Sequence, residues 1–270
     1  MEKKFKLGVI GAGFMSSAIV RGAVKSGFIS KTEVLVSDPS NIALEKMQNN
    51  NGVSVTSDNL KLANSCEFVL FAVKPQSFSE VAASINGCAC KKFISIMAGV
   101  KKTGIKTKIG NDVKIARCMP NTPCSVGFGA VGIDLSDYND NVDAEFIKGL
   151  FSSFASVVTV SEDKLNVVTG ISGSSPAYFY MFAKSLIDAG VKRGLSEDDA
   201  ETLVVNTLIG SGKMLLNRNN KTVEELISAV CSKGGTTIEA VKVYEEGGLY
   251  DLSEKAVNAC VNRATELENV

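Results

Sequence analysis

The sequence predicts an α/β protein in which a doubly wound parallel sheet is followed by an all-helical domain. Short apolar runs alternate with helical patterns over the first half of the chain, which is typical of parallel strands joined by helices. The strand pattern then disappears after about residue 164. A chain of 270 residues suits two modest domains, so we expect one over residues 1–164 and another over residues 165–270.

The elements of the first half follow from the spacing of the apolar residues. Residues 6–10 form a short apolar run, and residues 14–26 place Met15, Ile19 and Ala23 on one helical face. The run at residues 68–73 is apolar throughout, as expected for a strand that is covered on both faces. The same reasoning predicts a second helix at residues 40–49 and strands at residues 33–37, 53–55, 93–96 and 113–117.

The helices of the second half are recognised by their first residues. Ser175-Pro176 reads as an N-cap followed by proline at the first helical position, with Gly190 closing that helix. Residues 196–199 and 222–225 resemble capping boxes, and the first of them opens a helix that reaches about Leu216. Further helical patterns cover residues 237–244 and 253–267.

Composition excludes several classes of function. The chain has no histidine, which removes Ser-His-Asp and Cys-His catalysis, His-ligated zinc and histidine general bases, and we expect no metal site. Lys+Arg and Asp+Glu both number 29, so no net positive field attracts nucleic acid. No apolar run approaches the ~18 residues that span a membrane. The seven cysteines include no C-x-x-C pair and suit free thiols in a reducing, cytoplasmic protein.

A glycine-rich turn, Gly11-Ala12-Gly13-Phe14-Met15-Ser16, joins the first predicted strand to the first predicted helix. Gly11 allows the tight turn, and Gly13 lets a pyrophosphate approach the positive helix N-terminus. Ser16 stands where the usual fingerprint has a third glycine. A G-x-G alone is weak evidence, but its place on a strand–helix turn predicts a Rossmann-like, dinucleotide-binding domain. The alternative is a purely structural turn.

In dinucleotide-binding domains, residues at the end of the second strand contact the adenosine ribose of the cofactor. Asp38 could bind a ribose 2′-hydroxyl, which favours NAD(H). Ser37, Ser40 and Asn41 could instead donate to the 2′-phosphate of NADP(H), but no Arg or Lys stands beside them. Charge alone leaves the choice open.

Three further loops follow predicted strands, at the edge of the sheet where ligands of such folds bind. Lys74 could touch ribose or phosphate, Gly99 could admit a flat ring, and Pro120 stiffens a loop suited to a wall beside the nicotinamide. For Lys74 the alternative is a solvated lysine in a turn, and for the Pro120 loop it is a rigid structural connection. The predicted cofactor-binding residues are Gly11, Ala12, Gly13, Phe14, Met15, Ser37, Asp38, Asn59, Ala72, Val73, Lys74, Pro75, Ala98, Gly99, Pro120, Asn121 and Thr122.

One segment, Ser232-Lys233-Gly234-Gly235-Thr236-Thr237, interrupts the helical half. The glycines give a side-chain-free approach, and the threonines open the next helix. Unpaired N–H groups at a helix start, together with hydroxyls, suit a carboxylate. A plain helix–helix turn explains the segment equally well.

Five segments in order resemble the pyrroline-5-carboxylate reductases, the enzymes of the last step of proline biosynthesis. They are Gly11–Met15, Phe71–Gln76, Met119–Pro123, Ser172–Tyr178 and Ser232–Ala240. The last is the family's signature region, and the resemblance covers essentially the whole chain. Lys233 replaces a proline of the family pattern, Ser175 replaces a glycine, and Ser16 stands at a position that is often Gly or Ala.

The resemblance implies an NAD(P)H-dependent oxidoreductase that reduces the C=N bond of Δ1-pyrroline-5-carboxylate to give L-proline. It implies that Ser232, Gly234, Gly235, Thr236 and Thr237 bind the substrate, with Thr237 as the catalytic residue. It also places Asn59 near the adenosine end of NADPH, which favours NADP(H) while Asp38 leaves NADH open. The helical half would be a dimerisation domain, and the homodimers of this family assemble further into decamers.

Two other functions compete with this one. The β-hydroxyacid dehydrogenases carry a catalytic lysine in G-x-x-x-K-x-x-x-N, which Lys213 and Asn217 fit in part. A non-catalytic dinucleotide-sensing protein would bind the cofactor without turnover. The Ser232–Thr237 segment argues against the sensor, because a sensor needs no carboxylate cradle.

Overall fold

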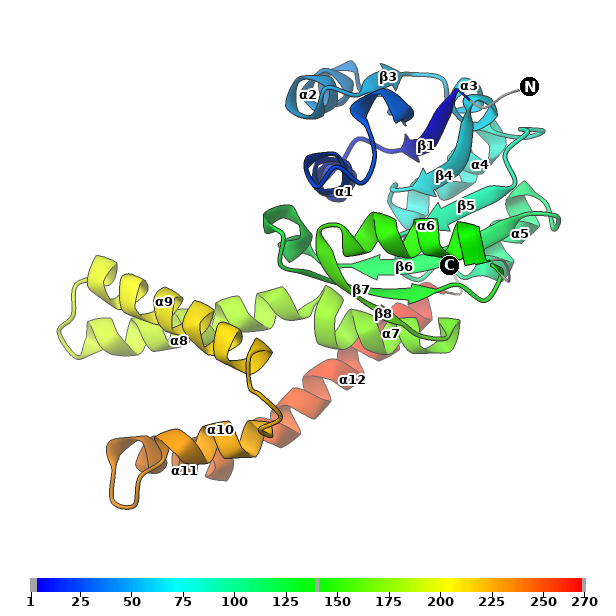
Figure 1. Ribbon diagram of the computed structural model, residues 1–270. Coiled ribbons are helices and arrows are strands. Elements are labelled where there is room, and N and C mark those ends of the chain that lie inside the picture. Colours follow the sequence, from blue (N-terminus) through cyan, green and yellow to red (C-terminus); the bar gives the residue numbers. More distant parts are fainter. Residues whose placement is uncertain (1–3, 139–140, 269–270) are drawn as a thin grey trace. The chain divides into compact units, whose positions relative to one another are not determined.

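The computed structural model describes residues 4–138 and 141–268 (Figure 1). The chain forms two compact units, one of Met1–Ser174 with Ala259–Val270 and the other of Ser175–Asn258. The division between functional domains at residue 164 stays a prediction, because compact units and functional domains need not coincide.

The first unit contains an eight-stranded sheet with the order β3-β2-β1-β4-β5-β6-β7-β8. Strands β1 to β6 are parallel, whereas β7 is antiparallel to β6 and parallel to β8. The strands are β1 (Phe5–Ile10), β2 (Val34–Ser37), β3 (Ser54–Thr56), β4 (Cys66–Phe71), β5 (Lys92–Ser95), β6 (Lys114–Pro120), β7 (Gly129–Asp134) and β8 (Ala155–Thr159). The predicted doubly wound sheet is confirmed.

Helices cover both faces of this sheet. One hydrophobic cluster joins the sheet to α1 (Phe14–Lys25), α2 (Asn41–Asn51) and α6 (Asn141–Ser152). A second cluster joins it to α3 (Asn59–Ser65), α4 (Phe78–Ser84) and α5 (Lys102–Ile109). Strand β4 shows why both faces are apolar: Phe68 and Leu70 belong to the first cluster, and Val69 and Phe71 to the second. Short turns η1 (Lys31–Glu33), η2 (Pro75–Ser77), η3 (Thr122–Val126) and η4 (Glu162–Lys164) connect these elements.

Strand β7 was not among the predicted elements, and its glycines explain why. Gly129 and Gly132 interrupt the β-branched pattern by which a strand is recognised. Each of them admits a neighbour: a Cβ at Gly132 would lie 2.8 Å from Val168, and one at Gly129 would overlap the thiol of Cys124. Close packing therefore requires glycine at both positions, and these glycines remove the pattern by which β7 could be recognised from the sequence.

The chain reverses direction across the sheet between β1 and β4. From β1 it runs outward through β2 to β3, and it then returns to the other side of β1 to build β4, β5 and β6. Ligands of open parallel sheets bind outside the carboxyl ends of the strands at such a switch point. The glycine turn after β1 and the Ala72–Pro75 segment after β4 both lie there.

The helical region begins in the first unit with α7 (Leu165–Val168) and a π-helical turn, η5 (Thr169–Gly173). It continues as α8 (Ser175–Lys192), α9 (Glu197–Leu216), α10 (Val223–Val230), α11 (Thr236–Glu246) and α12 (Leu249–Leu267). The N-caps predicted for α9 and α10 are confirmed, since Ser196 accepts the Asp199 N–H at 3.1 Å and Thr222 accepts the Glu225 N–H at 3.2 Å. The α10 cap is a complete capping box.

The predicted limits of α8 were wrong. Ser175 is its first helical residue and is separated from η5 by Ser174 alone, so it is not a cap outside the helix. Gly190 does not end the helix, which continues to Lys192, and the chain instead turns at Gly194 with φ +99°. Only Gly adopts such a backbone conformation without strain, which makes Gly194 the better stop signal.

The second unit buries few apolar side chains. Within its residues, all of which the structure describes, Pro176 and Ala200 are the buried apolar ones. Tyr180, Met181 and Leu216 are 65%, 73% and 71% exposed. So much apolar surface on one chain indicates a further partner.

Candidate functional site

The glycine turn after β1 has the geometry that a tight strand–helix turn requires. Gly11 has φ +106° and donates its N–H to the Ser37 carbonyl at 2.7 Å. A Cβ at Gly11 would lie only 2.6 Å from the Ala72 carbonyl oxygen, so a side chain there has no room. Gly13 is the N-cap of α1, and a Cβ built on it meets no atom within 4 Å. The turn therefore needs Gly11 for its own fold and leaves Gly13 open toward a ligand.

A cavity of about 460 Å³ opens beside this turn at the switch between β1 and β4. Of the predicted cofactor residues, it gathers Gly11, Gly13, Asp38, Asn59, Ala72, Val73 and Lys74. Four polar residues that the sequence did not single out also line it, Ser57, Ser77, Glu80 and Ser84. They follow β3 or lie on η2 and α4, where isolated polar residues carry no motif.

Asp38 holds two turns together at the rim of this cavity. Its Oδ2 accepts the Ala12 N–H at 2.8 Å, and its Oδ1 accepts the Ser40 N–H at 2.8 Å. The carboxylate thus connects the glycine turn to the start of α2. Because each carboxylate oxygen can accept more than one hydrogen bond, Asp38 keeps capacity for a ribose hydroxyl.

Asn59 occupies the same side of the cavity and is held at both ends of its amide. Its Oδ1 accepts the Ser37 hydroxyl at 2.7 Å, and its Nδ2 donates to Ser84 Oγ at 2.9 Å. Ser37 is fully buried and lies outside the cavity lining. The structure therefore makes Ser37 a support for Asn59, and its direct contact with a cofactor stays a prediction.

The remaining predicted cofactor residues lie outside this cavity. Phe14 is 63% exposed at the start of α1, while Ala12 and Met15 pack against the first hydrophobic cluster. Pro75 begins η2, and Thr122 begins η3. Their contacts with a cofactor stay predictions.

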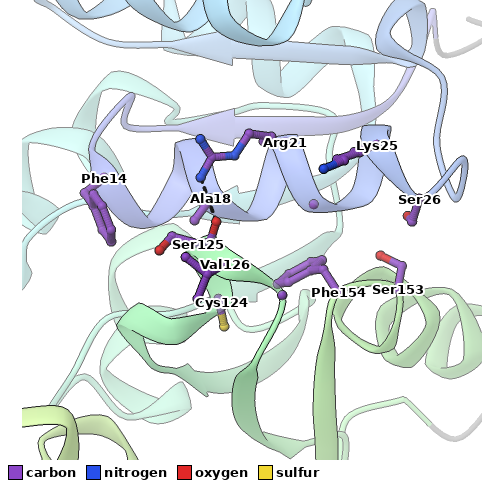
Figure 2. A pocket seen from close by; sticks show the side chains of 12 residues that line it. Phe14, Ala18, Arg21, Lys25, Ser26, Cys124, Ser125, Val126, Ser153 and Phe154 are labelled. Carbon is purple, nitrogen blue, oxygen red and sulfur yellow. Dashed lines mark hydrogen bonds between the residues drawn. The ribbon is translucent and has the colours of Figure 1, made fainter. Parts of the chain in front are cut away.

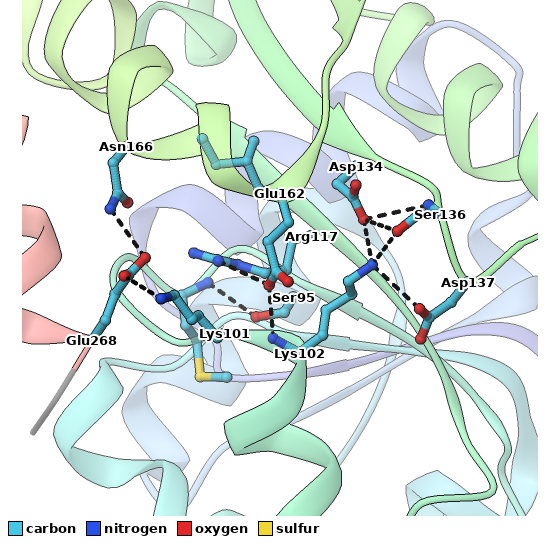
Figure 3. A network of polar contacts seen from close by, with 12 residues as sticks. Ser95, Lys101, Lys102, Arg117, Asp134, Ser136, Asp137, Glu162, Asn166 and Glu268 are labelled. Carbon is cyan, nitrogen blue, oxygen red and sulfur yellow. Dashed lines mark hydrogen bonds and ion pairs between the residues drawn. The ribbon is translucent and has the colours of Figure 1, made fainter.

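Position 99 requires glycine because α12 packs closely against it within the first unit. It has φ +71°, and a Cβ there would lie 2.8 Å from Leu267 at the end of α12. Glu268 holds this end of the chain, through an ion pair with Lys101 at 2.8 Å and a hydrogen bond from Asn166 at 3.0 Å (Figure 3). The glycine at position 99 is thus explained by helix packing.

A buried polar network supports the same loop (Figure 3). Arg117, 2% exposed, donates to Glu162 Oε1 at 3.0 Å, and that oxygen also accepts the Lys102 N–H at 2.8 Å. The Lys102 ammonium contacts Asp134 at 2.5 Å and Asp137 at 3.2 Å. Burial alone would lower the pKa of Lys102, but the carboxylates of Asp134 and Asp137 outweigh it and raise that pKa. Lys102 is therefore protonated at neutral pH and paired with both carboxylates.

Asn121 braces the loop that was expected to wall the nicotinamide. The residue is 8% exposed; its Oδ1 accepts the Ala130 N–H at 2.9 Å, and its Nδ2 donates to the Ser172 carbonyl at 3.3 Å. Pro120 ends β6 and pairs with Val131, so the stiff loop begins later than the predicted strand end at residue 117. The side chain of Asn121 thus points into the protein, between β7 and η5.

In the second unit, the Ser232–Thr237 segment forms the turn between α10 and α11. Gly234 has φ +72°, Gly235 is the N-cap of α11, and Thr236 and Thr237 open the helix as predicted. Gly235 donates its N–H to the Ser232 carbonyl at 2.9 Å. No side chain caps the start of α11, and no hydrogen bond of the Thr237 hydroxyl is found among the described residues. The alternative in which Thr237 caps its helix is therefore wrong.

Nucleophilic and metal chemistry have little support near β6. Burial raises the pKa values of the Cys118 and Cys124 thiols, so both stay protonated. Among the described residues, no group of three or more Cys, Asp or Glu could hold a metal ion. Within the same residues, no helix is long and apolar enough to cross a membrane.

Comparison with known proteins identifies the family. Residues 162–267 match the model for pyrroline-5-carboxylate reductase dimerisation, and residues 6–99 match that for coenzyme F420-dependent NADP oxidoreductase. The pyrroline-5-carboxylate reductase of Staphylococcus aureus (strain MSSA476) is 35% identical over 268 residues, 98% of each chain.

Two solved structures extend the likeness to the fold. A pyrroline-5-carboxylate reductase from Coxiella burnetii has a TM-score of 0.89 and 33% identity, over 98% of this chain and 99% of that one. The Plasmodium falciparum pyrroline carboxylate reductase, solved with NADP bound, has a TM-score of 0.87 and 30% identity, over 99% and 100%. With the sheet, the glycine turn and the helical region all matched end to end, the chain belongs to the pyrroline-5-carboxylate reductase family.

Proposed function

We propose that this chain reduces Δ1-pyrroline-5-carboxylate to L-proline with NADPH and also accepts NADH. The observation that carries the proposal is the cavity at the β1–β4 switch, with its open Gly13, on a chain that matches pyrroline-5-carboxylate reductases over 98% of its length. The full-length relatives decide against the β-hydroxyacid dehydrogenase and the sensor.

The residues around the cavity fit a dinucleotide. The bare backbone at Gly13 and the N–H groups at the start of α1 suit a pyrophosphate, and Asp38 and Asn59 border the place of the adenosine ribose. Lys74 is the one cation in the cavity lining, all of which is described, and it is available to a phosphate. When bound, the nicotinamide supplies the hydride for the imine carbon.

The start of α11 supplies what the substrate needs. Its first N–H groups and the hydroxyl of Thr236 would hold the carboxylate, and the hydroxyl of Thr237 would meet the ring nitrogen. The protonated imine is already electrophilic, so hydride addition at carbon completes the reduction without an acidic side chain. A chain without histidine is adequate for this reaction.

The exposed apolar residues of the second unit support a homodimer, formed through the segment that matches the dimerisation model. Further assembly of dimers into decamers, and a cytoplasmic location, are part of the same proposal. Light scattering at micromolar concentration should show at least a dimer. A single species of 28.5 kDa would contradict the dimer.

A steady-state assay tests the activity directly. The purified chain should oxidise NADPH in the presence of pyrroline-5-carboxylate, and the product should be L-proline in an amount equal to the NADPH consumed. NADH in place of NADPH should also support turnover. Absence of proline with both cofactors would refute the proposal, whereas oxidation of 3-hydroxy acids with NAD would favour the dehydrogenase.

A further inference from the structure

A second cavity in the first unit runs along α1, on the flank that faces η3 (Figure 2). It has a volume of about 790 Å³ and shares no lining residue with the cavity beside the glycine turn. Cavities of roughly 300–1,000 Å³ commonly hold small molecules. Of the residues predicted to bind cofactor or substrate, Phe14 alone lines this cavity.

The floor of this cavity is apolar and closely packed. Phe154, 8% exposed, lies against α1 because Gly22 has no side chain: a Cβ at Gly22 would lie 2.5 Å from the Phe154 ring. Val126 lies across the cavity from α1 and is 70% exposed. The apolar side chains Phe154 and Val126 are thus available to a flat or branched apolar group.

The polar groups of the cavity are donors with positive charge. Arg21 and Lys25 lie one turn apart on the same face of α1, and no Asp or Glu lines the cavity, all of whose lining residues are described. Neither cation has an ion-pair partner among the residues that the structure describes. Arg21 donates one N–H to the Ser125 carbonyl at 2.9 Å, and its other N–H groups are available to a ligand (Figure 2).

Two of the three serine hydroxyl groups that line the cavity donate to backbone carbonyls, and the third belongs to Ser125. Ser26 donates to the Ala23 carbonyl at 2.9 Å, and Ser153 donates to the Leu150 carbonyl at 2.7 Å. The donors left for a ligand are therefore the charged groups of Arg21 and Lys25, together with the Ser125 hydroxyl. A neutral apolar molecule would leave both cations without a partner, and a bare inorganic anion would leave the Phe154 floor uncovered.

We propose that this cavity is a binding site for a small organic anion that carries an apolar ring beside a phosphate group. The phosphate lies between Arg21 and Lys25, where a guanidinium can bind it in a bidentate manner, and the ring covers Phe154 and contacts Val126. The site is separate from the reaction proposed above, so either can hold without the other.

Isothermal titration calorimetry with phenyl phosphate tests this site on the intact protein in the presence of NADP⁺, which occupies the dinucleotide cavity. Arg21→Gln and Lys25→Gln should each raise the Kd for phenyl phosphate about fivefold or more, since each removes one charge-assisted contact. Lys46→Gln is the matched control, because Lys46 is an exposed lysine of α2 outside the cavity. Its Kd should stay within about twofold of the parent.

A second pair of measurements isolates the apolar part of the site. Val126→Ser should weaken phenyl phosphate more than inorganic phosphate, and the parent should bind phenyl phosphate more tightly than either inorganic phosphate or benzyl alcohol. Each variant is compared with the parent in melting temperature, and Arg21→Lys, which keeps the charge, should retain part of the affinity. No binding by the parent, or equal binding by an Arg21→Gln/Lys25→Gln double variant, would overturn the proposal, and so would equal affinity for inorganic phosphate.

Discussion

Replacing Gly13 by valine should weaken cofactor binding more than it weakens the fold. The backbone at Gly13 has φ −78° and ψ −171°, which any residue adopts, and a Cβ there meets no protein atom within 4 Å. The expected loss of stability is that of an N-cap glycine replaced by a branched residue, about 1 kcal/mol or less. That lowers the melting temperature by roughly 2–4 °C in a chain of this size.

The cost of the same change to the bound state is larger. The valine side chain fills the space through which the pyrophosphate must approach the first N–H groups of α1. We expect the Kd for NADPH to rise by well over tenfold, or more than about 1.4 kcal/mol. Gly13→Val should therefore lose more binding free energy than folding free energy.

Gly11 provides the contrasting variant. Its φ is +106°, and the methyl group of an alanine at this position would lie 2.6 Å from the Ala72 carbonyl oxygen, so Gly11→Ala strains the folded chain itself. A non-glycine residue in such a conformation costs about 1–3 kcal/mol before the collision is counted. Gly11→Ala should thus melt well below Gly13→Val in the absence of cofactor.

Two measurements decide the matter: the melting temperature without cofactor, and fluorescence titration with NADPH. Near-normal NADPH affinity in Gly13→Val would refute the placement of the pyrophosphate. A large fall in its melting temperature would show instead that Gly13 serves the fold.

Three further predictions concern other parts of the molecule. Thr237→Ala should reduce kcat about tenfold to a thousandfold. Its melting temperature should stay unchanged or rise slightly, because the Thr237 side chain does not cap the helix and alanine favours helices. Thr237→Ser should keep most activity, and unchanged kcat in the alanine variant would exclude the catalytic role. Asp38→Asn should raise about tenfold the kcat/KM for NADPH divided by the kcat/KM for NADH, because it removes a negative charge from the expected position of the 2′-phosphate. A constant ratio would exclude Asp38 as a determinant of cofactor preference. Burial alone would raise the pKa of Glu67, but the hydrogen bonds from Lys6 and Lys92 lower it from the ordinary value of a glutamate. This carboxylate therefore contributes stability above that ordinary value and loses it as the pH falls through the lowered pKa. Glu67→Gln should accordingly flatten the acid side of the stability profile measured by urea unfolding between pH 3 and 6, and an identical slope in both proteins would count against the ion pairs.

The parts of the fold that the sequence predicted well are those whose signals are local. The glycine turn, the buried run that became β4, the N-cap of α9 and the capping box of α10 each depend on neighbouring residues alone. Strand β7 depends on Gly129 and Gly132, which are small because Cys124 and Val168 press against them. Such a reason lies in tertiary packing and leaves no periodic pattern in the sequence.

The candidate site divides in the same way. Gly11, Gly13, Asp38 and Lys74 could be named because strand ends in a parallel sheet meet at one edge. Ser84 could not, because its place opposite Asn59 depends on how α4 packs against α3, and nothing on α4 marks it.

Asn121 shows most plainly where a motif stops being informative. Its position after β6, between two prolines, was read as a ligand site, yet its amide is spent on Ala130 and Ser172 inside the protein. A buried amide that loses its partners costs about 1–3 kcal/mol, so the residue is required here whether or not a cofactor touches the loop. The same argument applies to Asp38, whose carboxylate ties Ala12 to Ser40 before any ribose arrives. A polar residue at a ligand site thus holds the backbone first, and its part in binding is best measured as a ratio between two ligands, because loss of a backbone hydrogen bond affects both of them.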